Sequence, residues 1–312
     1  MGAGRFSSAD WATYSTATAS RSTREIFSKS SLDKDLDPMG VTRESRDSDL
    51  NPESNAIIVA CDVTGSMGMI ADNLVRKGLG VLFEEIYTRT PVKDPHIMVM
   101  GVGDYMVGDR APLQVGQFEA TVEPITEQLE KIFVEGGGGG NGYESYDLPM
   151  YFAAYHTSTD CFEKRNKRGY MFTIGDEPPP SKTTKEGVKR IVDENGDGLQ
   201  ADIPFQEVVD AAMKMYNVFH IVIAEGSHCR YAGVDTVAGA WKKYLGQNVI
   251  VVDDYTKISE VIVSIIEVNE GADVDTVSKS WDGDTALVVR KAVSDMEKAD
   301  AAFKNAKGVV EL

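Results

Sequence analysis

Three small oxygen-bearing side chains occupy alternate positions in the stretch "IIVACDVTGSMGMIADNL". Asp62, Thr64 and Ser66 directly follow an apolar run, and Gly65 allows the chain to turn tightly. Hard divalent cations prefer carboxylate, hydroxyl and water oxygens as ligands. Because this spacing can point the three side chains at one place, it predicts a metal site at the end of a strand. The alternative is that these residues only cap the following helix.

A second carboxylate for this site is found after another apolar run. Asp176 ends "GYMFTIGD", and Asp104 ends "HIMVMGVGD". The carboxyl ends of parallel strands lie at one edge of a sheet, where ligands bind. We therefore expect Asp176 to join Asp62 at the metal, and we expect Asp104, Tyr105 and Glu177 to line the rim where a partner binds.

The apolar pattern alternates between two periods along the middle of the chain. Short continuous apolar runs predict strands at 56–61, 96–104, 113–120, 169–177, 218–225 and 248–254. Apolar positions at helical spacing predict helices at 70–86, 125–133, 205–213, 234–245 and 258–265, with a further helix ending near residue 157. This alternation predicts an α/β fold with a doubly wound, mostly parallel, six-stranded sheet.

The two ends of the chain differ in composition from this middle part, at residues 55–270. Residues 1–54 are rich in Ser, Asp and Arg and predict an extended polar N-terminal arm. Residues 271–312 begin as a polar linker and continue as an amphipathic helix, whose narrow apolar seam is Ala286, Val289, Val293, Met296, Ala299 and Phe303. The helix either packs on its own domain or docks a partner, and arm and helix together offer contacts for self-assembly.

Bulk properties restrict the functional classes. The 312 residues carry a net charge of -17, which argues against binding to a nucleic-acid backbone. No run of apolar residues is long enough to predict a membrane span. The N-terminus lacks the apolar core of a secretory signal, and the three cysteines show no CxxC spacing. We therefore expect a cytoplasmic protein, in preference to one with a transit peptide.

The stretch "DVTGSMG" resembles the D-x-S/T-x-S signature of von Willebrand factor A (VWA) domains. The metal-ion-dependent adhesion site (MIDAS) of that family binds Mg²⁺. The resemblance spans residues 55–270. With "GDEPPP" it looks closer to intracellular bacterial, phage and alpha-kinase-associated VWA domains than to integrins, and it is similar to a stand-alone member of the bacterial or phage type. It implies a Rossmann-like VWA fold, with Asp62, Thr64, Ser66 and Asp176 at a Mg²⁺ ion; Mn²⁺ and Ca²⁺ are the alternatives.

The sequence departs from the family at the second metal loop. The usual threonine should fall within "GGGGGNGYES", which contains none. Asn141, Glu144 and Ser145 are the candidates to replace it, directly or through water. A glutamate would add negative charge at the ion.

The resemblance implies a non-catalytic protein-binding module, whose metal receives an acidic side chain of a protein partner. One alternative is a structural component of a virion or another large assembly, in which the VWA fold is a scaffold. A haloacid-dehalogenase-like phosphatase is a third hypothesis, because these enzymes also place an aspartate after the first strand. The second aspartate of those enzymes falls on Thr64 here, which is no comparable proton donor, so we expect no enzyme.

The stretch "DENGDG" resembles half of a calcium loop, but Pro204 replaces its final acid, and we interpret it as a polar turn.

Overall fold

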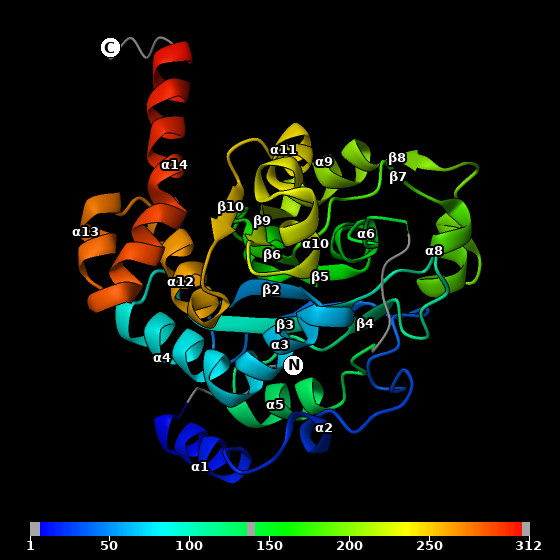
Figure 1. Cartoon of the computed structure of the whole chain (residues 1–312), viewed down its shortest axis with the longest axis horizontal. Coiled ribbons are helices and arrows are strands. Elements are labelled where there is room, and N and C mark those ends of the chain that lie inside the picture. The colour runs from blue at the N-terminus through cyan, green and yellow to red at the C-terminus, as the bar shows by residue number, and fades with distance from the viewer. Residues whose placement is uncertain (1–6, 136–140, 308–312) are drawn as a thin grey trace.

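The computed structural model describes residues 7–135 and 141–307 of the chain; for Ser66, Val75, Asp295 and residues 297–307 it describes the backbone alone. Its centre is a six-stranded sheet in the order β10-β9-β6-β2-β3-β4 (Figure 1). The strands are β2 (Asn55–Asp62), β3 (Pro95–Val102), β4 (Leu113–Val115), β6 (Gly169–Gly175), β9 (Tyr216–Ile223) and β10 (Val249–Val252). The predicted six-stranded, mostly parallel α/β sheet is confirmed.

One strand runs against the others. β4 pairs antiparallel with β3, whereas the remaining neighbours are parallel. The chain adds β3 and β4 on one side of β2, and then β6, β9 and β10 on the other side. The winding therefore reverses between β2 and β6, which is where a doubly wound sheet opens a crevice at its carboxyl edge.

Helices cover both faces of the sheet because successive residues of a buried strand point to opposite sides. Ile57, Val59 and Cys61 of β2 pack on one face, and Ala56, Ile58 and Ala60 pack on the other. The first face is covered by α3 (Gly68–Asn73), α4 (Leu79–Arg89), α5 (Val122–Glu130), α12 (Ile258–Asn269), α13 (Val274–Lys279) and α14 (Gly283–Lys307). The second face is covered by α6 (Asp147–Tyr155), α8 (Lys185–Ile191), α9 (Phe205–Met215) and α11 (Val234–Leu245).

Short elements complete the described chain. The connections hold α7 (Asp160–Glu163), α10 (Ser227–Ala232), the two-residue strands β7 (Lys182–Thr183) and β8 (Ile203–Pro204), 3-10 turns η1 (Gly65–Met67), η3 (Gly196–Gly198) and η4 (Tyr255–Lys257), and a π-helical turn η2 (Leu74–Gly78). "DENGDG" forms a turn in which Asp193 Oδ1 accepts the amides of Asn195 and Asp197. Within the described residues, no helix is long and apolar enough to cross a membrane. The three cysteines are free and buried.

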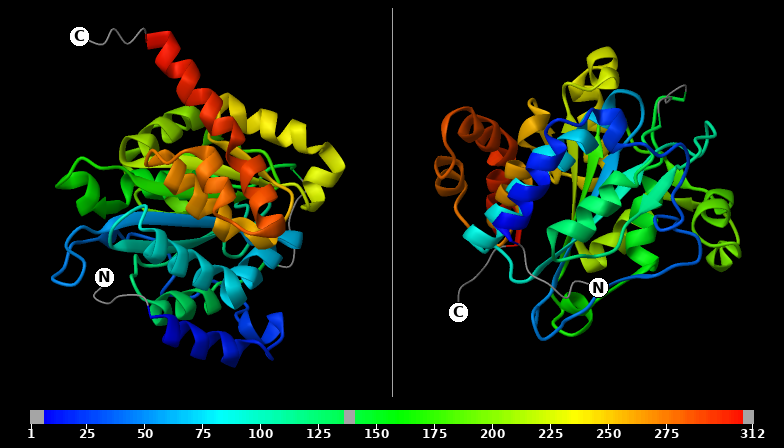
Figure 2. Two further views of the ribbon diagram at one scale, coloured as in Figure 1. Left: turned by 90° about the vertical axis from the view of Figure 1, so that its left-hand side faces the viewer. Right: turned by 90° about the horizontal axis from the view of Figure 1, so that it is seen from below.

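The expected extended arm at residues 1–54 is not found in its described part, residues 7–54; residues 1–6 lie outside the described residues. Ser7 caps α1 (Ser8–Thr18), and Ser22 and Glu25 form a capping box on α2 (Thr23–Ile26). Further on, β1 (Arg43–Ser45) pairs with β5 (Thr157–Thr159) in a separate two-stranded sheet. Helix α1 lies against α4 and α5 in both views of Figure 2. Local capping and contacts with the domain thus order the segment.

The indole of Trp11 fastens α1 to the domain. It lies so close over Gly80 of α4 that a Cβ on Gly80 would overlap the ring. Arg21 adds hydrogen bonds of 2.9 and 3.0 Å to the two carboxylate oxygens of Glu130 on α5. A bidentate pair of this kind fixes orientation as well as distance.

We expect Gly80→Ala to lower the free energy of unfolding by about 1–3 kcal/mol, because the added methyl group displaces Trp11. Urea denaturation followed by tryptophan fluorescence measures this. Gly239→Ala in α11 is the matched control, since a Cβ there meets nothing within 4 Å. Alanine is the better helix former, so the control should gain about 0.5–1 kcal/mol. An equal gain at Gly80 would contradict the docking of Trp11.

The predicted C-terminal helix is present and starts on its own domain. Val289 and Val293 of α14 are buried in the core, and Met296 packs against it. The side chains of Ala299 and Phe303 lie outside the described residues. Beyond this contact the backbone of α14 projects away from the body of the molecule (Figures 1 and 2). The preceding segment, expected to be a linker, contains α13, which Asp273 caps with a 2.8 Å bond from the Thr276 amide.

Candidate functional site

The site begins at the last residue of β2. Asp62 is buried, and its Oδ1 accepts hydrogen bonds from both the amide and the hydroxyl of Thr64, each at 2.8 Å. Gly65 has a φ of 41°, so the tight turn expected from the sequence is confirmed. Thr64 precedes η1, but its side chain makes no capping hydrogen bond. The cap-only interpretation is therefore wrong for Thr64.

Glu144 reaches the same threonine from a distant loop. It is fully buried, and its Oε1 lies 3.1 Å from Thr64 Oγ1. The other oxygen, Oε2, has no hydrogen-bond partner among the described residues. A hydroxyl has one hydrogen, so it cannot donate a full hydrogen bond to two carboxylates at once. Asp62, Thr64 and Glu144 together therefore hold more lone pairs than protons, which favours either an extra proton or a cation.

Burial raises the pKa of these acids and so favours their protonated forms. The pKa of Asp62 is raised to about 8, mainly by burial, against the two bonds from Thr64. The pKa of Glu144 is raised to about 10 by burial and then by the charges of Asp62 and Glu177. Glu177, in the loop that follows β6, has its pKa raised to about 7 by burial and by Asp176.

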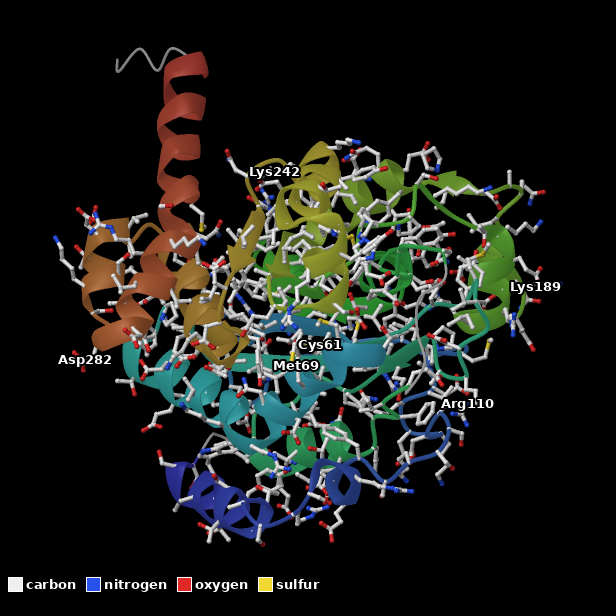
Figure 3. All side chains as sticks on the ribbon, in the orientation of Figure 1. Cys61, Met69, Arg110, Lys189, Lys242 and Asp282 are labelled. Carbon is white, nitrogen blue, oxygen red and sulfur yellow. The ribbon has the colours of Figure 1, made fainter. Side chains whose placement is uncertain are left out.

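The part of the chain that the structure describes places no lysine or arginine against this negative charge. Among the described residues, no lysine or arginine forms an ion pair with Asp62, Glu144 or Asp176. Figure 3 shows Cys61, the neighbour of Asp62, in the middle of the molecule, and the labelled basic side chains at its periphery. The Nδ1 atom of His228 lies 3.6 Å from Glu177 Oε1, and it would form an ion pair there when the imidazole is protonated.

Asp176 stands beside the site and caps a helix. Its Oδ2 accepts the amide of His228 in α10 at 2.7 Å, and its carbonyl oxygen accepts from Cys229 Sγ at 3.4 Å. Burial raises its pKa, and its charge in turn contributes to the raised pKa of Asp62. Asp176 therefore influences Asp62 electrostatically, with one of its carboxylate oxygens already engaged.

The other loop candidates bind Asp104 and not Asp62. Ser145 Oγ donates to Asp104 Oδ1 at 2.9 Å, and the side-chain amide of Asn141 donates to Asp104 Oδ2. The same Oδ1 also accepts the Met106 amide at 2.8 Å. Asp104 is fully buried, so the expectation that it lines the partner-binding rim is corrected: it ties two loops together.

The remaining rim residues are partly buried. Tyr105 packs against Gly187 and hydrogen-bonds Thr184 through its hydroxyl, and Glu177 is about 13% exposed. The large exposed side chains nearby are Met106, Val107 and, on α10, Tyr231, which is 92% exposed. Only the position of Met106 and Val107 after the end of β3 could have indicated them in the sequence, whereas Tyr231 lies within α10.

The donor types at Asp62, Thr64 and Glu144 suit a hard divalent cation, which prefers carboxylate and hydroxyl oxygens. Ser66 lies in η1, one turn on, but its side chain is outside the described residues. In the part of the chain that is described, no group of three or more His, Cys, Asp and Glu is arranged to hold a metal. Two carboxylates and a hydroxyl are brought together here, so waters or a partner would have to complete the coordination.

Neither a family model nor a curated protein matches this chain. Similar solved structures include the pilus adhesin SpaC from Lactobacillus rhamnosus GG (10% identity, TM-score 0.47), proximal thread matrix protein 1 from the mussel byssus (11%, 0.42) and a von Willebrand factor type A protein from Catenulispora acidiphila (11%, 0.39). The matches cover 73%, 73% and 72% of this chain, but only 32%, 48% and 44% of those chains. The acidic site itself is therefore the basis for a functional proposal.

Proposed function

We propose that the protein is a non-catalytic protein-binding module that holds a divalent cation, Mg²⁺ in the first place, at Asp62, Thr64 and Glu144. The observation that supports this most is the Thr64 hydroxyl, which lies within 3.1 Å of two buried carboxyl groups. A divalent cation would accept lone pairs from all three side chains and remove their mutual repulsion. Asp176 and Ser66 are further ligand candidates through water or directly.

The chain would hold this cation rigidly. Asp62 continues a buried strand, since the following residue, Val63, still donates its amide to Val102 at 3.0 Å. The Tyr146 hydroxyl contacts Asp62 Oδ2 at 3.4 Å, and its ring stands edge-on to Trp241 and His220 in the core. When bound, the cation supplies a positive charge that an acidic side chain of a partner can ligate. The exposed Met106, Val107 and Tyr231 would add apolar contact area around it.

We expect Mg²⁺ to raise the melting temperature of the EDTA-stripped protein and Asp62→Ala to abolish this response. A ligand that binds only the folded state adds about 2.7 kcal/mol at 100 times its Kd, which corresponds to several degrees. Mn²⁺ and Ca²⁺ titrations rank the metals, and calorimetry measures their Kd. Asp282→Ala is the control, because Asp282 is an exposed acid far from the site (Figure 3). A response that survives Asp62→Ala would contradict the proposed site.

The projecting end of α14 favours a second candidate function, a structural component of a virion or another large assembly (Figure 2). In that case the helix, and not the metal rim, would join neighbouring molecules. Removing residues 297–312 should then reduce the molar mass measured by light scattering and leave the Mg²⁺ response intact. An unchanged mass would count against assembly through α14.

A further inference from the structure

A groove of about 680 Å³ lies between the N-terminal helices and α5. A volume of this size is typical of a binding site. Residues three or four apart on a helix lie on one face, and each wall of the groove is such a face. The walls include Asp10, Thr13 and Ala17 from α1, and Val122, Thr126 and Glu130 from α5. Two neighbouring helices therefore leave room between them for a third element.

The floor of this α1–α5 groove is buried and mainly apolar. Ile26 of α2 and Val122 of α5 are both buried there. Thr126 is also buried, and its hydroxyl donates to the Val122 carbonyl oxygen at 2.9 Å, inside its own helix. A helix that lays an apolar face into a groove requires a floor of this kind.

The rim of the groove carries acids that no basic side chain pairs with. Asp10, Glu123 and Glu127 are exposed, and their carboxylates form no ion pair with any residue that the structure describes. Glu127 acts on Lys131 through its charge alone. The basic side chains of the walls are engaged with other carboxylates: Arg21 with Glu130 at 2.9 Å, Lys29 with Asp33 at 2.6 Å and Lys131 with Asp35 at 2.9 Å. The groove thus suits a helix with apolar residues on one face and lysines beside them.

The last part of α14 has this composition in the sequence. Residues 298–307 read "KADAAFKNAK", with three lysines and one acid in a chain whose net charge is -17. Ala299, Ala302, Phe303 and Ala306 follow the spacing i, i+3, i+4, i+7, which is the pattern of a helix that binds in a groove. Ten helical residues extend over about 15 Å, and the wall from Val122 to Lys131 has the same number of residues.

This segment lies far from the groove of its own chain. The end of α14 projects at the top of Figure 1 and of the left view of Figure 2, whereas α1 lies at the bottom of both. Within one molecule the helix therefore does not reach the groove. A second copy can supply it, since every copy presents a groove at one end and a projecting helix at the other.

We propose that residues 298–307 of α14 dock in the α1–α5 groove of a second copy of this chain. This inference rests on the second candidate function, assembly through α14, and identifies the surface that receives the helix. Helix and groove are different surfaces, so the contact is heterologous. Repeated contacts of this kind build rings or open filaments instead of closed twofold dimers.

The test exchanges charges between helix and groove in the full chain, in EDTA so that no bound metal contributes. The helix variant is Lys304→Glu with Lys307→Glu, and the groove variant is Glu123→Lys with Glu127→Lys. Each should raise the Kd of self-association about tenfold, because attractive pairs become repulsive. The chain with all four changes should return to within about threefold of the wild type, because the pairs are restored with reversed signs. Sedimentation velocity over a concentration series measures these Kd values.

Glu194→Lys with Glu207→Lys is the matched control for the groove variant. It changes the net charge equally, at exposed positions on the other side of the sheet, and should leave the Kd unchanged. Thermal unfolding shows that the variants are folded. Weaker association of the helix variant without an effect of the groove variant overturns the groove as the receptor and leaves assembly through α14 standing. A wild type that stays monomeric at all concentrations overturns both, and so does failure of the four changes to restore association when each pair of changes weakens it.

Discussion

Replacing Glu144 with glutamine is expected to stabilise the metal-free protein at pH 7 by about 1–3 kcal/mol. The wild-type carboxyl is fully buried, has one oxygen without a partner, and faces Asp62 across a single hydroxyl. Glutamine has nearly the same shape and carries no charge, and its amide can donate to an oxygen of Asp62 or Thr64. Urea denaturation in EDTA measures the gain.

The pKa of Glu144 explains why its replacement should stabilise the protein at pH 7. The folded-state pKa of Glu144 is about 10, far above that of an exposed glutamate. The folded protein therefore keeps a proton that the unfolded chain releases above about pH 4. The stabilising contribution of this group is present in full below that pH, and it falls as the pH rises toward 10. Glu144→Gln should flatten the curve, and Asp62, with a pKa of about 8, should leave a smaller slope.

Mg²⁺ is expected to change this comparison between the wild type and Glu144→Gln. With Mg²⁺ bound, the wild type should lose most of its pH dependence above neutrality, whereas Glu144→Gln should show a weaker Mg²⁺ response. Glu194→Gln, at an exposed turn position, is the matched control and should change neither curve. A Glu144→Gln variant less stable than the wild type in EDTA at pH 7 would show that the carboxylate is satisfied in the folded protein without a cation.

Asp62 and Thr64 could be found from the sequence because their signal is local. An apolar run of strand length that stops at an aspartate places that side chain at the edge of the sheet, whatever the rest of the chain does. The turn at Gly65 follows from the same few residues. The succession of strands and helices along the chain also follows from local signals, since each βαβ unit can be recognised separately.

The choice among Asn141, Glu144 and Ser145 could not be made from the sequence. These residues lie close together in the chain, but Glu144 turns to Thr64 while the other two turn to Asp104. The side chains point in different directions because the loop is fixed at Ser145. The amide of Ser145 donates a hydrogen bond of 3.2 Å to the carbonyl oxygen of Gly103. A contact between two loops that are far apart in the sequence thus decides which side chain faces the candidate metal site.

The N-terminal segment shows a signal that was present in the sequence and underestimated. Ser22 and Glu25 are a recognisable capping box, yet composition alone favours an extended arm. The sequence could not show the surface on which this segment packs. Trp11 lies against Gly80, which is about seventy positions further along the chain.

The largest loss of stability is expected from Gly175→Ala, at about 3 kcal/mol or more. A Cβ at this last residue of β6 would overlap the Tyr146 hydroxyl and lie 3.1 Å from Cβ of Asp62. Neither neighbour can move easily. Tyr146 is fully buried with its ring edge-on to Trp241 and His220, and Asp62 is fixed by the strand and by Thr64. The loss is measured by urea denaturation.

Tyr146→Phe tests whether this collision is the cause. Alone it should cost about 1 kcal/mol, since it removes only the long contact with Asp62. Combined with Gly175→Ala it should recover about 1 kcal/mol or more, because the overlapping oxygen is gone. Simple additivity of the two changes would contradict the contact. If the double variant also regains the Mg²⁺ response that Gly175→Ala loses, Tyr146 acts by positioning Asp62 and not as a ligand. The tight packing of Gly175, Tyr146 and Asp62 would then be the means by which the core holds the first ligand in place.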